Sequence, residues 1–205
     1  MLKTLEKFID ALWPTKCLNC EAVSGLRIFC RYCEPSIKTA DTDAAFLFTG
    51  PIRNVIHKAK FSPDESKARQ LMRYLPCLEK NEFDGIVFVP IHWRRRLTRG
   101  FDLSALFAQT LSKQLKIPVF DWLKNTRFDK PLTLSISKAE RVALTRGRYE
   151  LRKNSTTPKN ILLVDDVMTT GATLEAAKSV LVSAGHQVTC FSLAKTPLGS
   201  KLKSI

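Results

Sequence analysis

The fold of this chain is decided by Ile161-Leu162-Leu163-Val164-Asp165-Asp166-Val167-Met168-Thr169-Thr170-Gly171-Ala172-Thr173. The four leading aliphatic residues predict a buried parallel strand that ends in two carboxylates. A small turn with hydroxyl groups and a glycine follows, and a helical pattern begins at Leu174. Backbone N–H groups at the start of a helix lack partners and meet the positive end of the helix dipole. The stretch therefore predicts an anion site beside a pair of acids, which suits a ribose 5-phosphate.

The same stretch resembles the phosphoribosyl-pyrophosphate (PRPP) motif of the type I phosphoribosyltransferases. The resemblance implies that Asp165 and Asp166 hold the ribose 2′ and 3′ hydroxyls and that the Thr169–Thr173 loop holds the 5-phosphate. The PRPP-binding residues it implies are Asp165, Asp166, Val167, Met168, Thr169, Thr170, Gly171, Ala172 and Thr173. The alternative is an ordinary strand–turn–helix with a capping threonine. Capping alone does not explain two adjacent acids before Thr-Thr-Gly.

Two Cys-x-x-Cys pairs near the N-terminus predict a metal site, formed by Cys17, Cys20, Cys30 and Cys33. Four thiolates at this spacing favour one tetrahedral, structural zinc ion. Disulfides and a redox pair are the alternatives. Residues 1–10 are charged and amphipathic, unlike a secretory leader, so we expect a cytoplasmic chain in which metal binding is favoured over disulfides. Cys77 and Cys190 are expected to be small core residues.

Length and composition predict one α/β domain with a small metal module. Of the 205 residues, 44% are hydrophobic, enough for a proper core. No stretch approaches the ~20 apolar residues that span a bilayer. We expect an N-terminal helix and a four-cysteine zinc-binding module over residues 1–45 and a phosphoribosyltransferase-like domain over residues 46–205, with the seam between residues 34 and 45.

Strand and helix patterns alternate after this seam. The expected strands cover residues 46–48, 86–89, 161–164 and 188–194, and the expected helices begin at Pro51 or cover residues 65–75, 103–115 and 174–184. This alternation predicts an α/β fold with a mainly parallel sheet flanked by helices. Ligands in such sheets bind beyond the carboxyl ends of the strands, where the two aspartates would lie.

A basic segment, Val89–Asp102, follows one of the predicted strands and is expected to be a loop at the same sheet edge. It carries Arg94, Arg95, Arg96 and Arg99. Guanidinium groups match phosphate oxygens, so these side chains are candidates for contacts to pyrophosphate or DNA. The alternative is a solvated basic loop. Lys138, Arg141 and Arg146 lie in a second basic segment, between residues 133 and 148, that we expect to close over the pyrophosphate as a lid.

Several segments along the chain are similar to the ComF competence-protein family. They are Leu12–Cys17, Ile56-His57-Lys58-Ala59-Lys60-Phe61, Arg94–Phe101 and Leu134–Arg141. The chain departs at Asp102-Leu103, where the family often has Asn-Gln. The resemblance implies a bacterial cytoplasmic protein that supports natural transformation by handling incoming single-stranded DNA, with other DNA-uptake proteins as candidate partners. The net charge of +14 agrees with a polyanionic partner.

Two functions are therefore open. The first is a competence protein that binds PRPP and single-stranded DNA. The second is a Mg²⁺-dependent phosphoribosyltransferase that transfers phosphoribose to a base or amine in nucleotide salvage. No residue names the acceptor or a catalytic group. Three aromatic residues next to basic ones could stack on bases, although such residues are more often core: Trp93, Phe101 and Tyr149.

Overall fold

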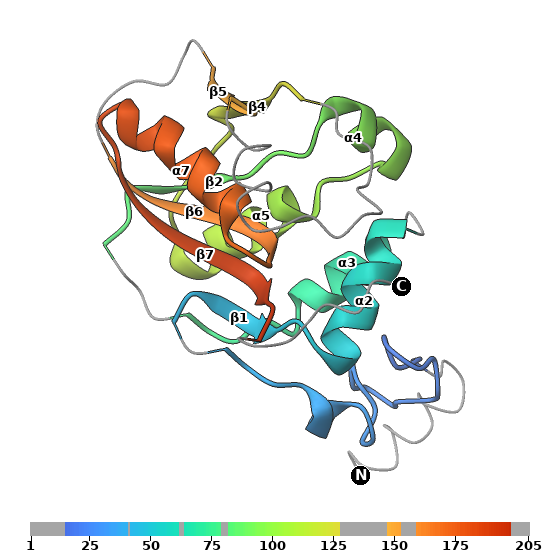
Figure 1. Ribbon diagram of the computed structural model, residues 1–205. Coiled ribbons are helices and arrows are strands. Elements are labelled where there is room, and N and C mark those ends of the chain that lie inside the picture. Colours follow the sequence, from blue (N-terminus) through green and yellow to red (C-terminus); the bar gives the residue numbers. More distant parts are fainter. Residues whose placement is uncertain are drawn as a thin grey trace.

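A five-stranded parallel sheet forms the centre of the protein (Figure 1). In this computed structural model, residues 15–40, 42–61, 64–78, 82–127, 147–152 and 159–197 are described. The strands, in spatial order, are β1 (Ala44–Leu47), β7 (Gln187–Lys195), β6 (Asn160–Met168), β2 (Gly85–Phe88) and β3 (Val119–Phe120). Every neighbouring pair in this sheet is parallel. The predicted fold class is thus confirmed.

Helices cover both faces of the sheet. Successive side chains of a strand point to opposite faces, and apolar side chains face both ways. Ile161 and Leu163 of β6 pack with α7 (Ala172–Ser183), whereas Leu162 and Val164 pack in a second cluster with α5 (Leu103–Leu115). That second cluster also contains residues of α2 (Gly50–Phe61) and α3 (Glu65–Met72). Figure 1 shows α7 and α5 on opposite sides of the strands.

The central strand β6 is longer than predicted. The sequence predicted a strand over residues 161–164 that ends in acids, but β6 continues to Met168 and includes both aspartates. Pairing with β7 is the reason, because the register extends as far as Val167 with Ala194 and Met168 with Lys195. The two carboxylates therefore belong to a hydrogen-bonded strand, which restricts their backbone.

Other boundaries differ in ways that the local chain explains. The helix predicted over residues 65–75 ends at Met72, where the next amides bond only three residues back and Pro76 follows. The arginine segment, expected as a loop, contains a short helix, α4 (Trp93–Arg99). No sequence pattern indicated the antiparallel pair β4 (Leu123–Asn125) and β5 (Tyr149–Leu151), or the 3₁₀ turn η1 (Glu34–Ser36).

The cysteine module, residues 15–40, packs directly against the helical layer. Phe29 is fully buried and meets Tyr74 edge-on, with ring centroids 4.8 Å apart. Lys58 Nζ on α2 donates to the backbone oxygen of Asn19 at 2.9 Å. Thr39 forms a bridge with Phe46 of β1. The module therefore shares one hydrophobic core with α2, α3 and the sheet.

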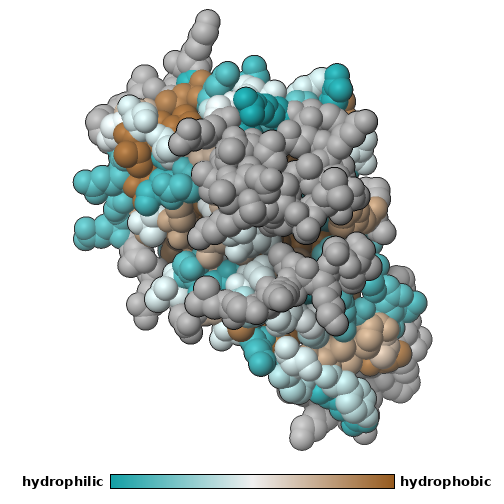
Figure 2. Space-filling view, in the orientation of Figure 1, coloured by the Kyte–Doolittle hydropathy of each residue, from teal (hydrophilic) through white to brown (hydrophobic). Residues whose placement is uncertain are grey.

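Apolar side chains also lie on the outside of this module. Figure 2 shows apolar surface there, at the lower right, where Val23 and Leu26 are exposed.

Outside the module, Cys77 is exposed, so the prediction that it is a core residue is wrong, and Cys190 is only partly buried. Among the described residues, no helix is both long and apolar enough to cross a membrane.

Candidate functional site

A cleft of about 620 Å³ opens at the carboxyl ends of β2 and β6. The sheet brings its walls together from four parts of the chain: the end of α2, the β2–α4 segment, the β4–β5 pair and the tip of β6 with the start of α7. The charged and hydroxyl side chains that line it are Lys60, Arg95, Thr98, Arg99, Arg127, Arg148, Tyr149, Asp165, Asp166 and Thr173. Asp165 and Asp166 thus share the cleft with some of the predicted cations, such as Arg95 and Arg99, but not with all of them.

Asp165 and Asp166 lie at the floor of this cleft, exposed by only 7% and 9%. Asp165 Oδ1 accepts hydrogen bonds from Ser104 Oγ at 3.1 Å and from the Asp166 amide at 2.8 Å. Burial, and secondly the neighbouring Asp166 carboxylate, raise the pKa of Asp165 well above its ordinary value. Two carboxylates in so little water are costly, so the arrangement favours a ligand that supplies hydroxyl donors or cations.

Lys60 supplies the cation that Asp166 needs. Its Nζ lies 2.8 Å from Asp166 Oδ1, and both side chains are largely shielded from water. Lys60 stands near the end of α2, more than a hundred residues from Asp166 in the chain. No sequence pattern indicates Lys60 as a site residue. Lys60 lies in the Ile56–Phe61 segment, which resembles a segment of the ComF family. That resemblance does not indicate that Asp166 is the partner of Lys60.

The Thr169–Thr173 loop follows β6 and leads into α7. Gly171 precedes the helix with φ +78°, a left-handed conformation that a residue with a side chain adopts only under strain. Thr170 Oγ1 accepts from the Ala172 amide at 3.4 Å, and Thr173 lines the cleft. The N-cap residue Gly171 has no side chain to cap α7, so Thr170 supplies this contact to the first turn. Of residues 169–173, Thr173 in the first turn of α7 lines the cleft with the aspartates, whereas Thr169 and Thr170 do not.

The four arginines of the basic segment separate onto two sides of α4. Arg95 and Arg99, one helical turn apart, line the cleft, whereas Arg94 and Arg96 do not line it. The Arg94 guanidinium lies over the Trp93 ring, 5.3 Å from its centroid. Burial lowers the pKa of Arg99, and the nearby Asp166 carboxylate opposes that shift.

Caps fix the position of this arginine helix. His92 Nδ1 accepts from the Arg94 amide at 3.2 Å, and Gly100 ends α4 in a left-handed conformation. The buried Asp102 caps α5 and also accepts from the Ile91 amide at 3.0 Å through Oδ2. Asp102 therefore has a structural role at the start of α5.

Two further cations, Arg127 and Arg148, line the cleft, and no sequence pattern indicates them as site residues. They flank the β4–β5 pair, whose existence the sequence did not reveal. Lys138, Arg141 and Arg146 lie outside the described residues. Of the candidate stacking residues, Trp93 is 57% exposed, whereas two are buried: Phe101 and Tyr149.

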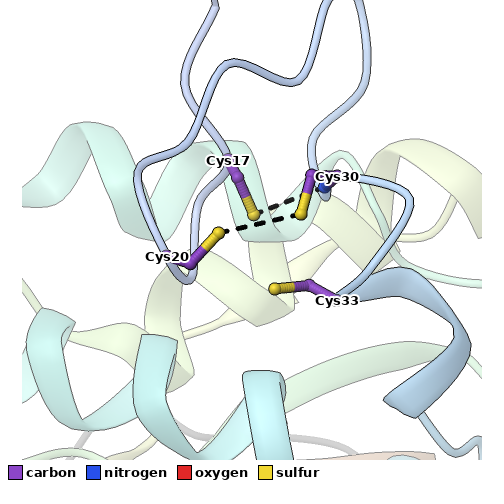
Figure 3. A group of neighbouring side chains, drawn as sticks. All are labelled: Cys17, Cys20, Cys30 and Cys33. Atoms are coloured by element: carbon purple, nitrogen blue, oxygen red, sulfur yellow. Dashed lines mark hydrogen bonds between the residues drawn. The ribbon is translucent and has the colours of Figure 1, made fainter.

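The four N-terminal cysteines converge at a second site (Figure 3). All four sulfur atoms lie within 4.8 Å of one another, and the Cys20 and Cys30 sulfurs are 3.7 Å apart. Thiolates bound to one tetrahedral ion at about 2.3 Å lie about 3.8 Å from each other, so the spacing fits. Burial opposes ionisation of Cys17, but surrounding backbone N–H groups outweigh it and lower the pKa of the thiol to about 6. This cluster can hold a metal ion.

The phosphoribosyl transferase domain family matches residues 102–204 of the chain. Competence protein ComFC from Streptococcus pneumoniae is 26% identical over 183 residues, which cover 88% of this chain and 76% of that protein. DNA utilization protein YhgH from Escherichia coli K12 is 32% identical over 161 residues, covering 73% and 69%. The chain belongs to the ComF group of phosphoribosyltransferase-like proteins. Lys60 and Arg99, both in the cleft, belong to the two segments whose sequence resembles the ComF family, residues 56–61 and 94–101.

Two solved structures are similar to this ComF-type chain at low identity. Orotate phosphoribosyltransferase from Aeropyrum pernix is 16% identical with a TM-score of 0.40, covering 79% of this chain and 77% of that one. Glutamine phosphoribosylpyrophosphate amidotransferase from B. subtilis is 21% identical with a TM-score of 0.40, and the match covers 68% of this chain and 27% of that one.

Proposed function

We propose that this ComF-type protein binds PRPP in the cleft at the end of β6. The observation that carries the proposal is the meeting of two buried carboxylates with a surplus of cations. Asp165 and Asp166 share the cleft with five cationic side chains: Lys60, Arg95, Arg99, Arg127 and Arg148. A ligand that combines a diol with phosphates satisfies both sets, because carboxylates accept from hydroxyls and guanidinium groups bind phosphate oxygens.

Each part of the ligand has a counterpart in this cleft. The aspartates hold the ribose hydroxyls, and the Thr169–Thr173 loop with the start of α7 holds the 5-phosphate. Arg95 and Arg99 approach from α4 and hold the pyrophosphate. Oxygen-rich surroundings of this kind suit Mg²⁺, which, when bound with the diphosphate, supplies positive charge that favours its departure.

The test is titration calorimetry with PRPP and magnesium on the wild type, Asp165→Asn and Asp166→Asn. We expect each variant to bind at least about tenfold more weakly, because a hydrogen bond to a charged group contributes about 1.5–3 kcal/mol. Asp121→Asn is the matched control, since Asp121 is exposed and pairs with Arg152 outside the cleft lining. Equal affinity for all four proteins would exclude the site.

We also propose that the protein supports natural transformation in the cytoplasm by handling single-stranded DNA. The relatives named for competence and DNA utilization support this role. The side of α4 away from the cleft also supports this role. Its exposed residues are Trp93, Arg94, Arg96 and Leu97. An exposed ring between guanidinium groups combines base stacking with phosphate contacts, as single-strand-binding surfaces do. The DNA would then lie outside the cleft, and other uptake proteins remain proposed partners.

The two sides of α4 allow a matched experiment. Arg94→Ala/Arg96→Ala is expected to weaken single-stranded DNA binding and to reduce its salt slope by about 1.4, since each phosphate contact contributes about 0.7. Arg95→Ala/Arg99→Ala is expected to weaken PRPP binding instead. Binding isotherms for both ligands at several salt concentrations check this. A DNA slope that only the Arg95/Arg99 variant changes would contradict the assignment.

Phosphoribosyl transfer is the second candidate activity, favoured by the open cleft beside the aspartates. An acceptor nitrogen would bond to the ribose C1 while the C1–O bond breaks. The electron pair of that bond would leave with pyrophosphate, and the proton of the acceptor would pass to solvent. The charge that develops on the sugar resembles an oxocarbenium ion, which Asp165 and Asp166 would stabilise. Pyrophosphate release with a panel of bases tests turnover.

For the cysteine cluster we propose structural zinc. Four cysteines occupy every position of a tetrahedral ion, so no position is open for catalysis. The sulfur spacing described above supports this assignment, and the packing of the module against α2 supports a role in folding.

A further inference from the structure

An aromatic side chain forms part of the lip of the cleft. Phe61 is the last residue of α2, lines the cleft and is 73% exposed. It follows Lys60, whose ammonium group holds Asp166 on the cleft floor. A large apolar ring in so charged a cleft binds no phosphate and no ribose hydroxyl. We therefore expect the Phe61 ring to contact a part of the ligand that has an apolar face.

Two further rings hold Phe61 in place. The buried Phe48 stacks on His57 with centroids 5.9 Å apart and planes 26° apart. His57 stacks in turn on Phe61 at 5.5 Å and 23°. His57 and Phe61 are one helical turn apart on α2, so the stack runs from the core to the cleft. Burial, with Arg53 and Lys60 nearby, lowers the pKa of His57. The exposed ring of Phe61 therefore rests on a stack of rings that reaches the hydrophobic core.

The ring and the guanidinium groups of α4 reach the cleft from different directions. α2 follows β1, α4 follows β2, and these strands lie on opposite sides of β6 in the sheet. When a group on a sugar carbon is displaced with inversion, the incoming atom approaches the face opposite the leaving group. With the pyrophosphate on the α4 side, the group that replaces it on C1 belongs on the α2 side, at Phe61.

We propose that Phe61 is the stacking platform for a planar aromatic base carried on the ribose C1. The cleft then binds nucleoside 5′-monophosphates as well as PRPP, and the acceptor in any transfer is an aromatic base rather than a small amine. This inference rests on the proposed ribose-phosphate site. Stacking of one base on an aromatic side chain strengthens binding by about 5- to 140-fold.

The experiment compares ligands with and without a base. Titration calorimetry gives the dissociation constants of ribose 5-phosphate, AMP and UMP for the wild type, Phe61→Ala and Phe61→Trp. We expect both nucleotides to bind the wild type at least about fivefold more tightly than ribose 5-phosphate. That gain falls to about onefold in Phe61→Ala and persists in Phe61→Trp, while ribose 5-phosphate affinity stays constant.

Tyr32→Ala is the matched control, because Tyr32 is also 73% exposed but belongs to the cysteine module. Circular dichroism confirms that each variant is folded. If ribose 5-phosphate binds through Asp165 and Asp166 but the nucleotides gain nothing, or keep their gain in Phe61→Ala, only the stacking inference is overturned. If ribose 5-phosphate and the nucleotides all fail to bind the wild type, the stacking inference and the proposed ribose-phosphate site fail together.

Discussion

Asp165 is placed where a carboxylate is least stable without a ligand. It is buried, lies beside a second acid, and receives its two hydrogen bonds at the same oxygen, Oδ1. An asparagine would keep both bonds and remove the charge. Residues that bind charged ligands often reduce the stability of the free protein in this way. Replacing this carboxylate with an amide should therefore increase the stability of the ligand-free protein.

The first prediction concerns pH. The folded-state pKa of Asp165 is raised, so the unfolded chain loses this proton first as pH rises. The favourable contribution of the neutral carboxyl is complete below the unfolded pKa of about 4 and is lost as pH rises through the folded pKa. Ligand-free Asp165→Asn should thus be more stable than the wild type by about 1–3 kcal/mol at neutral pH, with little difference near about pH 4.

Urea unfolding at several pH values measures this difference. Asp121→Asn again serves as the control, because that carboxylate is exposed. A constant gap between Asp165→Asn and the wild type across the pH range would show that the buried charge is not its cause.

At the scale of elements, periodic apolar segments were predictable from sequence and the site walls were not. The helix over residues 103–115 and the strand pattern around Ile161 follow from apolar spacing alone. In contrast, α4 has no buried residue, and its ends are set by His92 and Gly100. Lys60, Arg127 and Arg148 could not be placed at the site because their proximity depends on strand order and on the β4–β5 pair.

The second prediction concerns the start of α5. Asp102 accepts from the amides of Ser104 and Ala105 through Oδ1 and from Ile91 through Oδ2. Asp102→Ala should destabilise the protein by about 1–2 kcal/mol through loss of the cap. Asp102→Asn should fall between the two, because an amide keeps the Oδ1 acceptor and loses the contact with Ile91. Chemical denaturation measures both changes, and an alanine variant as stable as the wild type would contradict this role.

At the scale of the whole molecule, α2 connects the two sites. Asn54 and Lys58 contact Asn19 in the cysteine module, while Lys60 and Phe61 reach the cleft. A structural zinc ion contributes about 10–16 kcal/mol of apparent binding energy, comparable with the stability of an entire domain at about 5–15 kcal/mol. The cysteine module and α2 share one hydrophobic core. The division of the chain into two domains at residue 45 therefore remains a prediction.

The third prediction follows from this connection. Cys17→Ser should retain less than one equivalent of zinc, melt at a lower temperature and bind PRPP more weakly, because the packing of α2 is disturbed. Metal analysis, thermal unfolding and calorimetry measure the three effects. Cys77→Ser is the control, since Cys77 is exposed and not part of the cluster. A Cys17→Ser protein with one full equivalent of zinc would exclude the four-cysteine site.

The central position of β6 has a consequence for how the protein comes apart. From Ile161 to Val164 this strand is paired on both sides, with β2 and with β7, and its residues from Ile161 to Asp166 are buried. Backbone amides in such a strand exchange with heavy water only when the whole domain opens, whereas amides of outer elements exchange through local fluctuations. The backbone that leads into the two aspartates, from Ile161 to Val164, should therefore be among the slowest to exchange. Fraying at the margins of the molecule would leave that backbone intact.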